Sequence, residues 1–178
     1  MIHLKNKVWA LLAGLGLLLP SCLAQPTGLV QNKAYDRTLS TMLNPDEVSV
    51  LSVNQLHQLG PENVILLDTR SREEYDVSHI PGAIWVGYEE FQSERVRNLN
   101  PDQKVIVYCS VGYRSEKIGE KLQGLGFTNV QNLYGSIFEW ANQSYPLISP
   151  SGDTIQQIHA YNRVWGKWMT NDQVEKKY

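Results

Sequence analysis

The side chain best suited to chemistry in this sequence is Cys109, which ends an apolar run. From Val105 the chain reads VIVYCSVGYRSEKIGEKLQGLG, a pattern typical of a strand, a loop and an amphipathic helix. The loop consists of Ser110, Val111, Gly112, Tyr113, Arg114 and Ser115. Its backbone amides can curl toward the sulfur, and the helix that follows adds its positive end. Because such surroundings lower the pKa of a thiol from about 8.5, the pattern favours an ionised, nucleophilic Cys109.

Two side chains of this loop could act together with the thiolate. Arg114 can stabilise the sulfur anion or clamp an anionic substrate. Tyr113 could shape the access of a substrate, although a ring that simply faces solvent fits the sequence equally well. A structural alternative also exists for Cys109, since free cysteines often serve as small apolar side chains that fill a gap.

Other polar residues are better explained by structural roles. Asp68 and Arg70 end an apolar run, and we expect them to support the site through an ion pair or through bracing of a loop. His79 lies in the turn SHIPGA, where a hydrogen bond that holds the loop is its expected role. His57 and His159 have no neighbouring cluster of ligands in the sequence, so we predict no metal site.

Short apolar runs alternate with helical segments along the central part of the chain. The runs read VSVLS, VILLD, AIWV, KVIVYC and VQNLY. This alternation predicts an α/β domain with a central, mostly parallel sheet flanked by helices. Ser52 with Gln55 and Ser71 with Glu74 match the capping box that begins a helix. Functional groups of such sheets lie beyond the carboxyl ends of the strands, which is the position of Cys109.

The N-terminus has the pattern of an export signal. Lys5 and Lys7 precede an uncharged run over residues 8–19, which is too short to span a membrane as a helix. The run ends in LLPSC, which resembles the lipobox of bacterial lipoproteins and predicts a signal peptide over residues 1–21 and a lipidated Cys22. An ordinary secretory signal cleaved nearby is the alternative. Either signal predicts an extracytoplasmic protein, and the lipobox places it in the bacterial cell envelope, anchored at the periplasmic face of a membrane.

Charge and cysteine content narrow the possible partners. The net charge is −2, and removal of residues 1–21 would remove two lysines and no acids, which gives −4. This mildly acidic balance disfavours nucleic acid as a partner.

In an oxidising compartment Cys22 and Cys109 would ordinarily suggest a disulfide. If Cys22 carries lipid, that pairing is impossible and Cys109 is a free thiol.

Three segments of the chain resemble the rhodanese (thiosulfate sulfurtransferase-like) family. They read LLDTRSREEYDVSHIPGAIWV, VYCSVGYRS and NLYGSIFEWANQSYPL, in the family's order, and the resemblance covers about Val48 to Pro146. The family's double glycine before the last helix is replaced by Gly135 and Ser136, a departure that we expect to affect helix packing more than chemistry.

The resemblance implies a persulfide enzyme with Cys109 as the nucleophile. The thiolate would take the outer sulfur of a small anionic donor such as thiosulfate and pass it to a thiol or to cyanide, in two covalent steps and without a metal or organic cofactor. The loop from Ser110 to Ser115 would bind the substrate, with the amides of residues 111–114 facing the sulfur and Arg114 attracting the sulfonate end of the donor.

Two other function classes remain open. Rhodanese-like domains can act as binding or regulatory modules, in which Cys109 would be a redox sensor without turnover. Phosphatases and arsenate reductases of related fold use a similar loop with one more residue between cysteine and arginine. The shorter C-x4-R loop, together with Tyr108 where tyrosine-specific phosphatases carry histidine, favours sulfur transfer.

The sequence predicts one folded domain with an extension on each side. Residues 22–47 form a tether with a possible short helix, indicated by Tyr35, Leu39 and Leu43. The rhodanese-like domain covers residues 48–148. Residues 149–178 are predicted to form a helical extension, because apolar residues recur there at roughly helical spacing. These are Ile155, Ile158, Trp165, Trp168 and Met169. We expect this stripe to pack on the domain, although a lid or a partner site is an alternative.

Overall fold

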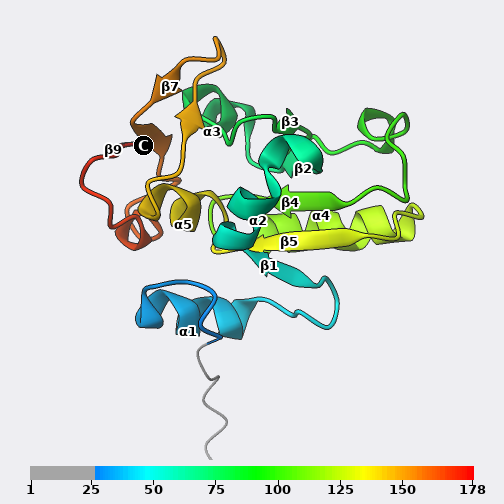
Figure 1. The fold of residues 1–178 in the computed structure, drawn as a ribbon, viewed down its shortest axis with the longest axis horizontal. Helices are drawn as coiled ribbons and strands as arrows, with labels where there is room; N and C mark the ends of the chain where they lie inside the picture. The colour runs from blue at the N-terminus through cyan, green and yellow to red at the C-terminus, as the bar shows by residue number, and fades with distance from the viewer. Residues whose placement is uncertain (1–26) are drawn as a thin grey trace, which may run out of the picture.

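A parallel β-sheet forms the centre of the molecule. The computed structural model describes residues 27–178. The strands are β1 (Val50–Ser52), β2 (Ile65–Asp68), β3 (Ile84–Trp85), β4 (Val105–Tyr108) and β5 (Val130–Tyr134). They are ordered β1-β5-β4-β2-β3, and every pairing is parallel, as Figure 1 shows. The predicted α/β architecture is therefore confirmed.

Helices cover both faces of the sheet. They are α2 (Val53–Leu59), α3 (Arg72–Val77), α4 (Tyr113–Gly124) and α5 (Ser136–Asn142), with short 3-10 turns at Pro61–Asn63 and Ser93–Arg95. Alternate residues of β4 enter two apolar clusters, because successive strand side chains point to opposite faces. Ile106 packs in the cluster that includes α2 and α5, whereas Val105 and Val107 pack with Ile118 and Leu122 of α4. Both predicted capping boxes are present, at α2 and α3.

The segment before the sheet contains α1 (Lys33–Met42), which begins at Asn32, whose side chain accepts hydrogen bonds from two backbone amides. The apolar side chains that predicted this helix, Tyr35, Leu39 and Leu43, are buried in the larger cluster. The Tyr35 hydroxyl donates to the Gly135 carbonyl at 3.1 Å, so α1 is integrated into the domain.

The predicted signal peptide and Cys22 lie outside the described residues. Within residues 27–178, no helix combines the length and apolarity needed to cross a membrane.

The prediction of a helical C-terminal extension is wrong. This segment, orange to red in Figure 1, forms short strands beside α3 and α5. β6 (Leu147–Ile148) pairs with β7 (Thr154–Ile155), β8 (Gln157–His159) pairs with β9 (Glu175–Lys177), and a 3-10 turn covers Gly166–Trp168.

Side chain to backbone hydrogen bonds explain why no α-helix forms there. The Asn162 side chain accepts from the amides of Val164 and Trp165 and makes a turn, an interaction that competes with helical pairing. The apolar side chains nevertheless pack on the domain. Ile158 and Met169 are buried in the core, and Trp168 stacks on a ring of α1.

Candidate active site

Cys109 lies directly after β4, at the carboxyl edge of the sheet. It is 1% exposed, and the amide of Gly112 donates to its sulfur at an N to Sγ distance of 3.1 Å. Gly112 has a φ of 125°, a region that disfavours other residues, and a Cβ there would meet Leu43 at 3.0 Å. The loop therefore turns sharply into α4 at the one residue that permits it, and its amides face the sulfur.

The charge environment favours the thiolate form of Cys109. Burial alone would raise the pKa of the thiol. The positive charge of Arg114 and the amides of Ser115, Gly112 and Val111 outweigh burial and hold the pKa below its ordinary value. The sequence analysis expected the amides of residues 111–114 at the sulfur, and the structure places those of Val111 and Gly112 there together with the amide of Ser115. Of the two roles considered for Arg114, this charge effect is the stabilising one.

Two polar residues outside the loop hold it in shape. The Cys109 amide donates to Ser136 Oγ at 3.2 Å, and that hydroxyl donates to the Leu133 carbonyl at 3.0 Å. Asn132 Nδ2 donates to the Gly112 carbonyl at 2.9 Å. The serine that replaces a family glycine thus contacts the backbone of the candidate nucleophile, which goes beyond the packing role expected for it.

Arg114 is paired with a carboxylate that the sequence did not single out. Its Nη1 and Nη2 lie 2.7 Å and 2.8 Å from the two oxygens of Glu74, and Ser110 Oγ donates to the same carboxylate at 2.7 Å. Although burial would raise the pKa of Glu74, these partners lower it to about 2. In the sequence this residue is explained by its capping role, which it also performs toward the Ser71 amide at 3.1 Å. The oxygen that accepts from the Ser71 amide, Oε2, also binds Arg114 Nη1, so capping and the ion pair use the same carboxylate.

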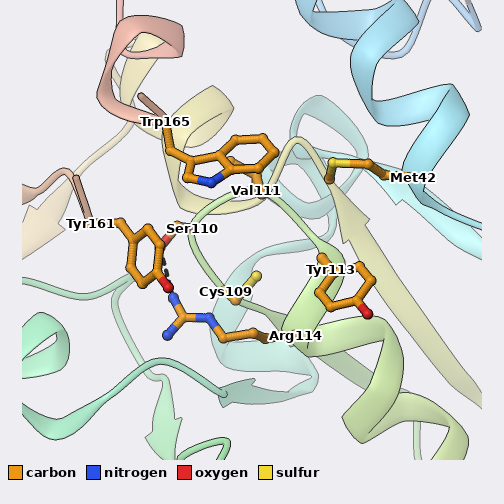
Figure 2. Close-up of a pocket in the computed structure, with 8 residues that line it drawn as sticks. All are labelled: Met42, Cys109, Ser110, Val111, Tyr113, Arg114, Tyr161 and Trp165. Carbon is orange, nitrogen blue, oxygen red and sulfur yellow. Dashed lines mark hydrogen bonds between the residues drawn. The ribbon is translucent and has the colours of Figure 1, made fainter. Parts of the chain in front are cut away.

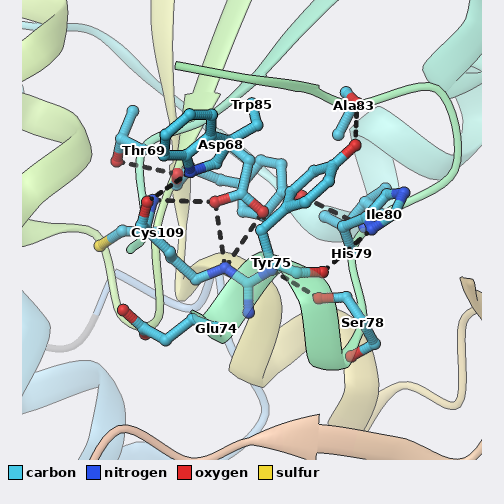
Figure 3. A network of polar contacts seen from close by, with 12 residues as sticks. Asp68, Thr69, Glu74, Tyr75, Ser78, His79, Ile80, Ala83, Trp85 and Cys109 are labelled. Carbon is cyan, nitrogen blue, oxygen red and sulfur yellow. Dashed lines mark hydrogen bonds and ion pairs between the residues drawn. The ribbon is translucent and has the colours of Figure 1, made fainter. Parts of the chain in front are cut away.

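Asp68 and Arg70 form a fully buried ion pair, 2.7 Å between Nη2 and Oδ2 (Figure 3). Arg70 also donates to the Ser78 carbonyl at 2.6 Å, and its own carbonyl accepts from Trp85 Nε1 at 2.9 Å. The pair therefore joins the end of β2 to the turn after α3. Neither residue lines the pocket at Cys109, so their place in the structure is the bracing one expected for them.

The histidines have local structural contacts. His79 stacks on Tyr75 at a centroid distance of 3.9 Å, its Nδ1 lies 3.2 Å from the Tyr75 carbonyl, and burial lowers its pKa. His57 stacks on Tyr145, and His159 Nδ1 accepts from the Tyr161 amide. Across residues 27–178, no group of three His, Cys, Asp or Glu side chains is placed to hold a metal ion.

A pocket of about 310 Å³ opens above Cys109 (Figure 2). The loop contributes Cys109, Ser110, Val111, Tyr113 and Arg114 to its lining, and the remainder comes from Met42, Tyr161 and Trp165. Met42 ends α1, whereas the two aromatic residues belong to the C-terminal segment. Tyr113 lines the pocket and is also 48% exposed, so both interpretations of its ring stay open. Met42 and Tyr161 were not predicted as site residues, because they lie far from the loop along the chain. Trp165 belongs to the apolar stripe for which packing on the domain was expected and a lid was the alternative.

A buried cysteine with a lowered thiol pKa, in a loop between a parallel strand and a helix, is an arrangement found in α/β proteins that use a thiolate. More specifically, the chain belongs to the rhodanese-like domain family, whose sequence model matches residues 52–143. A rhodanese-related protein from Thermoplasma volcanium, 27% identical, has a TM-score of 0.50 and covers 56% of this chain and 96% of its own.

Curated relatives carry different names. A tRNA uridine(34) hydroxylase of Listeria welshimeri is 33% identical over 108 residues, which are 56% of this chain and 34% of that protein. A putative sulfur carrier protein of Bacillus subtilis, YrkF, is 30% identical over 83 residues, which are 47% of this chain and 44% of that protein. This chain therefore spans about a third of the length of the hydroxylase that it matches.

Proposed function

We propose that the protein is a sulfurtransferase that carries a sulfane sulfur atom as a persulfide on Cys109. The observation that supports this most directly is the sulfur at the base of an open pocket, with the Gly112 amide at 3.1 Å and a thiol pKa below its ordinary value. A persulfide anion needs the same stabilisation as a thiolate. The loop amides that face the sulfur can supply it without a metal or cofactor.

The proposed reaction has two displacement steps. The Cys109 thiolate attacks the outer sulfur of a donor such as thiosulfate, the donor's S–S bond breaks, and sulfite leaves with the bonding electrons. A thiol or cyanide then attacks the outer sulfur of the persulfide. Cys109 leaves as a thiolate, ready for the next donor. The first step requires an ionised Cys109 as the nucleophile, and in the second step Cys109 leaves as a thiolate. The charge environment of the loop, which stabilises that thiolate, therefore affects both rates.

Sulfur loading of Cys109 is the first prediction. After incubation with thiosulfate or inorganic polysulfide and removal of the donor, intact-mass spectrometry should show one added sulfur atom. Cyanide should remove this sulfur and release thiocyanate. The matched control is Cys109→Ser, which keeps the size of the side chain and should gain nothing. An added sulfur in the serine variant would contradict the assignment.

The same preparations separate the other two function classes. A redox sensor should gain no sulfur from either donor and should instead give a sulfenate on Cys109 after peroxide treatment. A phosphatase should release phosphate from an aryl phosphate in a Cys109-dependent manner. Either result, in a protein that does not load sulfur, would replace the sulfurtransferase proposal. Hydroxylation of tRNA is named for much longer relatives and is not part of this proposal.

We also propose that the chain is exported and anchored to a bacterial envelope membrane through lipid on Cys22. The support is the sequence pattern of residues 1–22, which lie outside the described structure. Expressed in bacteria with a labelled fatty acid, the wild type should incorporate label and Cys22→Ser should not. Cys109→Ser is the control and should keep the label. Incorporation that persists without Cys22 would exclude the lipoprotein assignment.

A further inference from the structure

The wall of the pocket above Cys109 is built by segments outside the central sheet. Met42 comes from α1, and Tyr161 and Trp165 come from the loop between β8 and β9 (Figure 2). These three side chains present a thioether and two aromatic rings. Apolar groups bind to such surfaces, because contact removes apolar area of both partners from water, which is favourable in free energy.

The two aromatic residues are held in place by their own loop. Tyr161 has a φ of 62°, which is uncommon for a residue other than glycine, and its amide donates to His159 Nδ1 at 3.1 Å. The amide of Trp165 donates to Asn162 Oδ1 at 3.0 Å, and the indole packs against the main apolar cluster. The wall is therefore an ordered part of the fold.

The charges at the pocket give little advantage to an acceptor thiol that carries a negative group. Among the described residues that line it, Arg114 is the only cation, and both oxygens of Glu74 bind its guanidinium. The ring of Tyr161 covers the same guanidinium, with Cζ 5.0 Å from the ring centroid. With Cys109 ionised, two negative charges surround one positive charge. An incoming sulfonate would have to compete with Glu74 for Arg114.

Building on the sulfurtransferase function proposed above, we infer that the thiol that exchanges sulfur with Cys109 has an uncharged aromatic or aliphatic body. This body would contact Met42, Tyr161 and Trp165 while its sulfur reaches Cys109. The thiol first loses its proton to solvent, and its thiolate then attacks the outer sulfur of the Cys109 persulfide. The S–S bond of the enzyme breaks, Cys109 leaves as a thiolate, and the product is the persulfide of the organic thiol. Atoms and electrons balance without an added oxidant or reductant.

The test compares two thiols of similar size and opposite character. Full-length protein is loaded with polysulfide, desalted, and mixed with 2-phenylethanethiol or with 2-mercaptoethanesulfonate, and loss of the added sulfur is followed by mass spectrometry. Each transfer rate is divided by the fraction of that thiol that is ionised at the pH of the assay, so that the two thiolates are compared directly. The wild type should react with the phenyl compound about tenfold faster or more, the range that apolar pocket contacts supply.

Three variants locate the source of this preference. Tyr161→Ala and Trp165→Leu should each bring the ratio of the two rates close to one, whereas Val164→Ala should leave it unchanged. Val164 is the matched control, because it lies between the two aromatic residues, is 67% exposed and does not line the pocket. Since a ratio is measured within each variant, a general loss of stability does not mimic the effect.

The outcomes separate this inference from the function on which it rests. A wild type that never gains sulfur would overturn the sulfurtransferase function itself. A wild type that gains sulfur and transfers it equally to both thiols would overturn only the proposed thiol class. The same conclusion would follow if the preference persisted in both aromatic variants.

Discussion

Replacement of Asp68 by alanine is expected to lower the free energy of unfolding by about 3–5 kcal/mol, because it leaves a buried guanidinium without its counterion. Both partners of the Asp68–Arg70 pair are completely buried, and Arg70 contacts the carboxylate through two nitrogens. Charge attraction to Asp68 raises the pKa of Arg70 despite its burial. In the alanine variant this attraction is lost, but the guanidinium stays charged at neutral pH, because arginine does not lose its proton in proteins. Urea unfolding at neutral pH measures the difference.

A second ion pair, within the neighbouring helix α3, provides the matched control. Arg72 and Asp76 lie 2.8 Å apart but are 55% and 45% exposed. Asp76→Ala should therefore leave the free energy of unfolding nearly unchanged, since exposed pairs contribute little. The double variant Asp68→Ala/Arg70→Met should recover part of the lost stability by removing the unpaired charge. If Asp68→Ala unfolds at the same urea concentration as Asp76→Ala, the bracing role is contradicted.

Replacement of Arg114 by alanine is expected to slow persulfide formation at neutral pH by about tenfold to a hundredfold, the effect of losing one charge-assisted contact of about 1.5–3 kcal/mol. Arg114 is the main positive charge that lowers the pKa of the Cys109 thiol. Without it the pKa rises, a smaller fraction of the thiol is ionised at neutral pH, and the pH profile of the reaction moves to higher pH. Arg114→Lys should restore only part of the rate, because lysine keeps the charge but cannot bind Glu74 through two nitrogens.

Glu74→Gln should move the same titration in the opposite direction. Glutamine still suits the capping position of α3, but it no longer neutralises Arg114. The arginine charge then acts on Cys109 alone, and the thiol pKa should fall. Thiolate absorbance against pH, with Cys109→Ser as the blank, follows both variants. An unchanged titration in Arg114→Ala would mean that the loop amides alone activate the sulfur.

Local sequence signals were sufficient to predict the sheet, the capping boxes and the position of Cys109. A capping box is made within four residues, and the strand and helix patterns repeat over two to four residues. Such interactions can therefore be predicted from residues that are neighbours in the sequence. The order from strand to cysteine to glycine to helix favours amides that face the sulfur, and contacts from Ser136 and Asn132 then hold the loop in that shape.

Only the tertiary structure decided which distant residues complete the site. Glu74 meets Arg114 because α3 and α4 follow adjacent parallel strands, β2 and β4, whose carboxyl ends lie at the same edge of the sheet. Met42, Tyr161 and Trp165 reach Cys109 only through the packing of both terminal segments on the core. In the C-terminal segment, helical spacing of apolar residues was misleading, since turn hydrogen bonds at Asn162 and strand pairing with β9 outweigh a weak local preference. Contacts between residues far apart in the chain depend on how whole helices and strands pack together. That packing cannot be predicted from a short stretch of sequence.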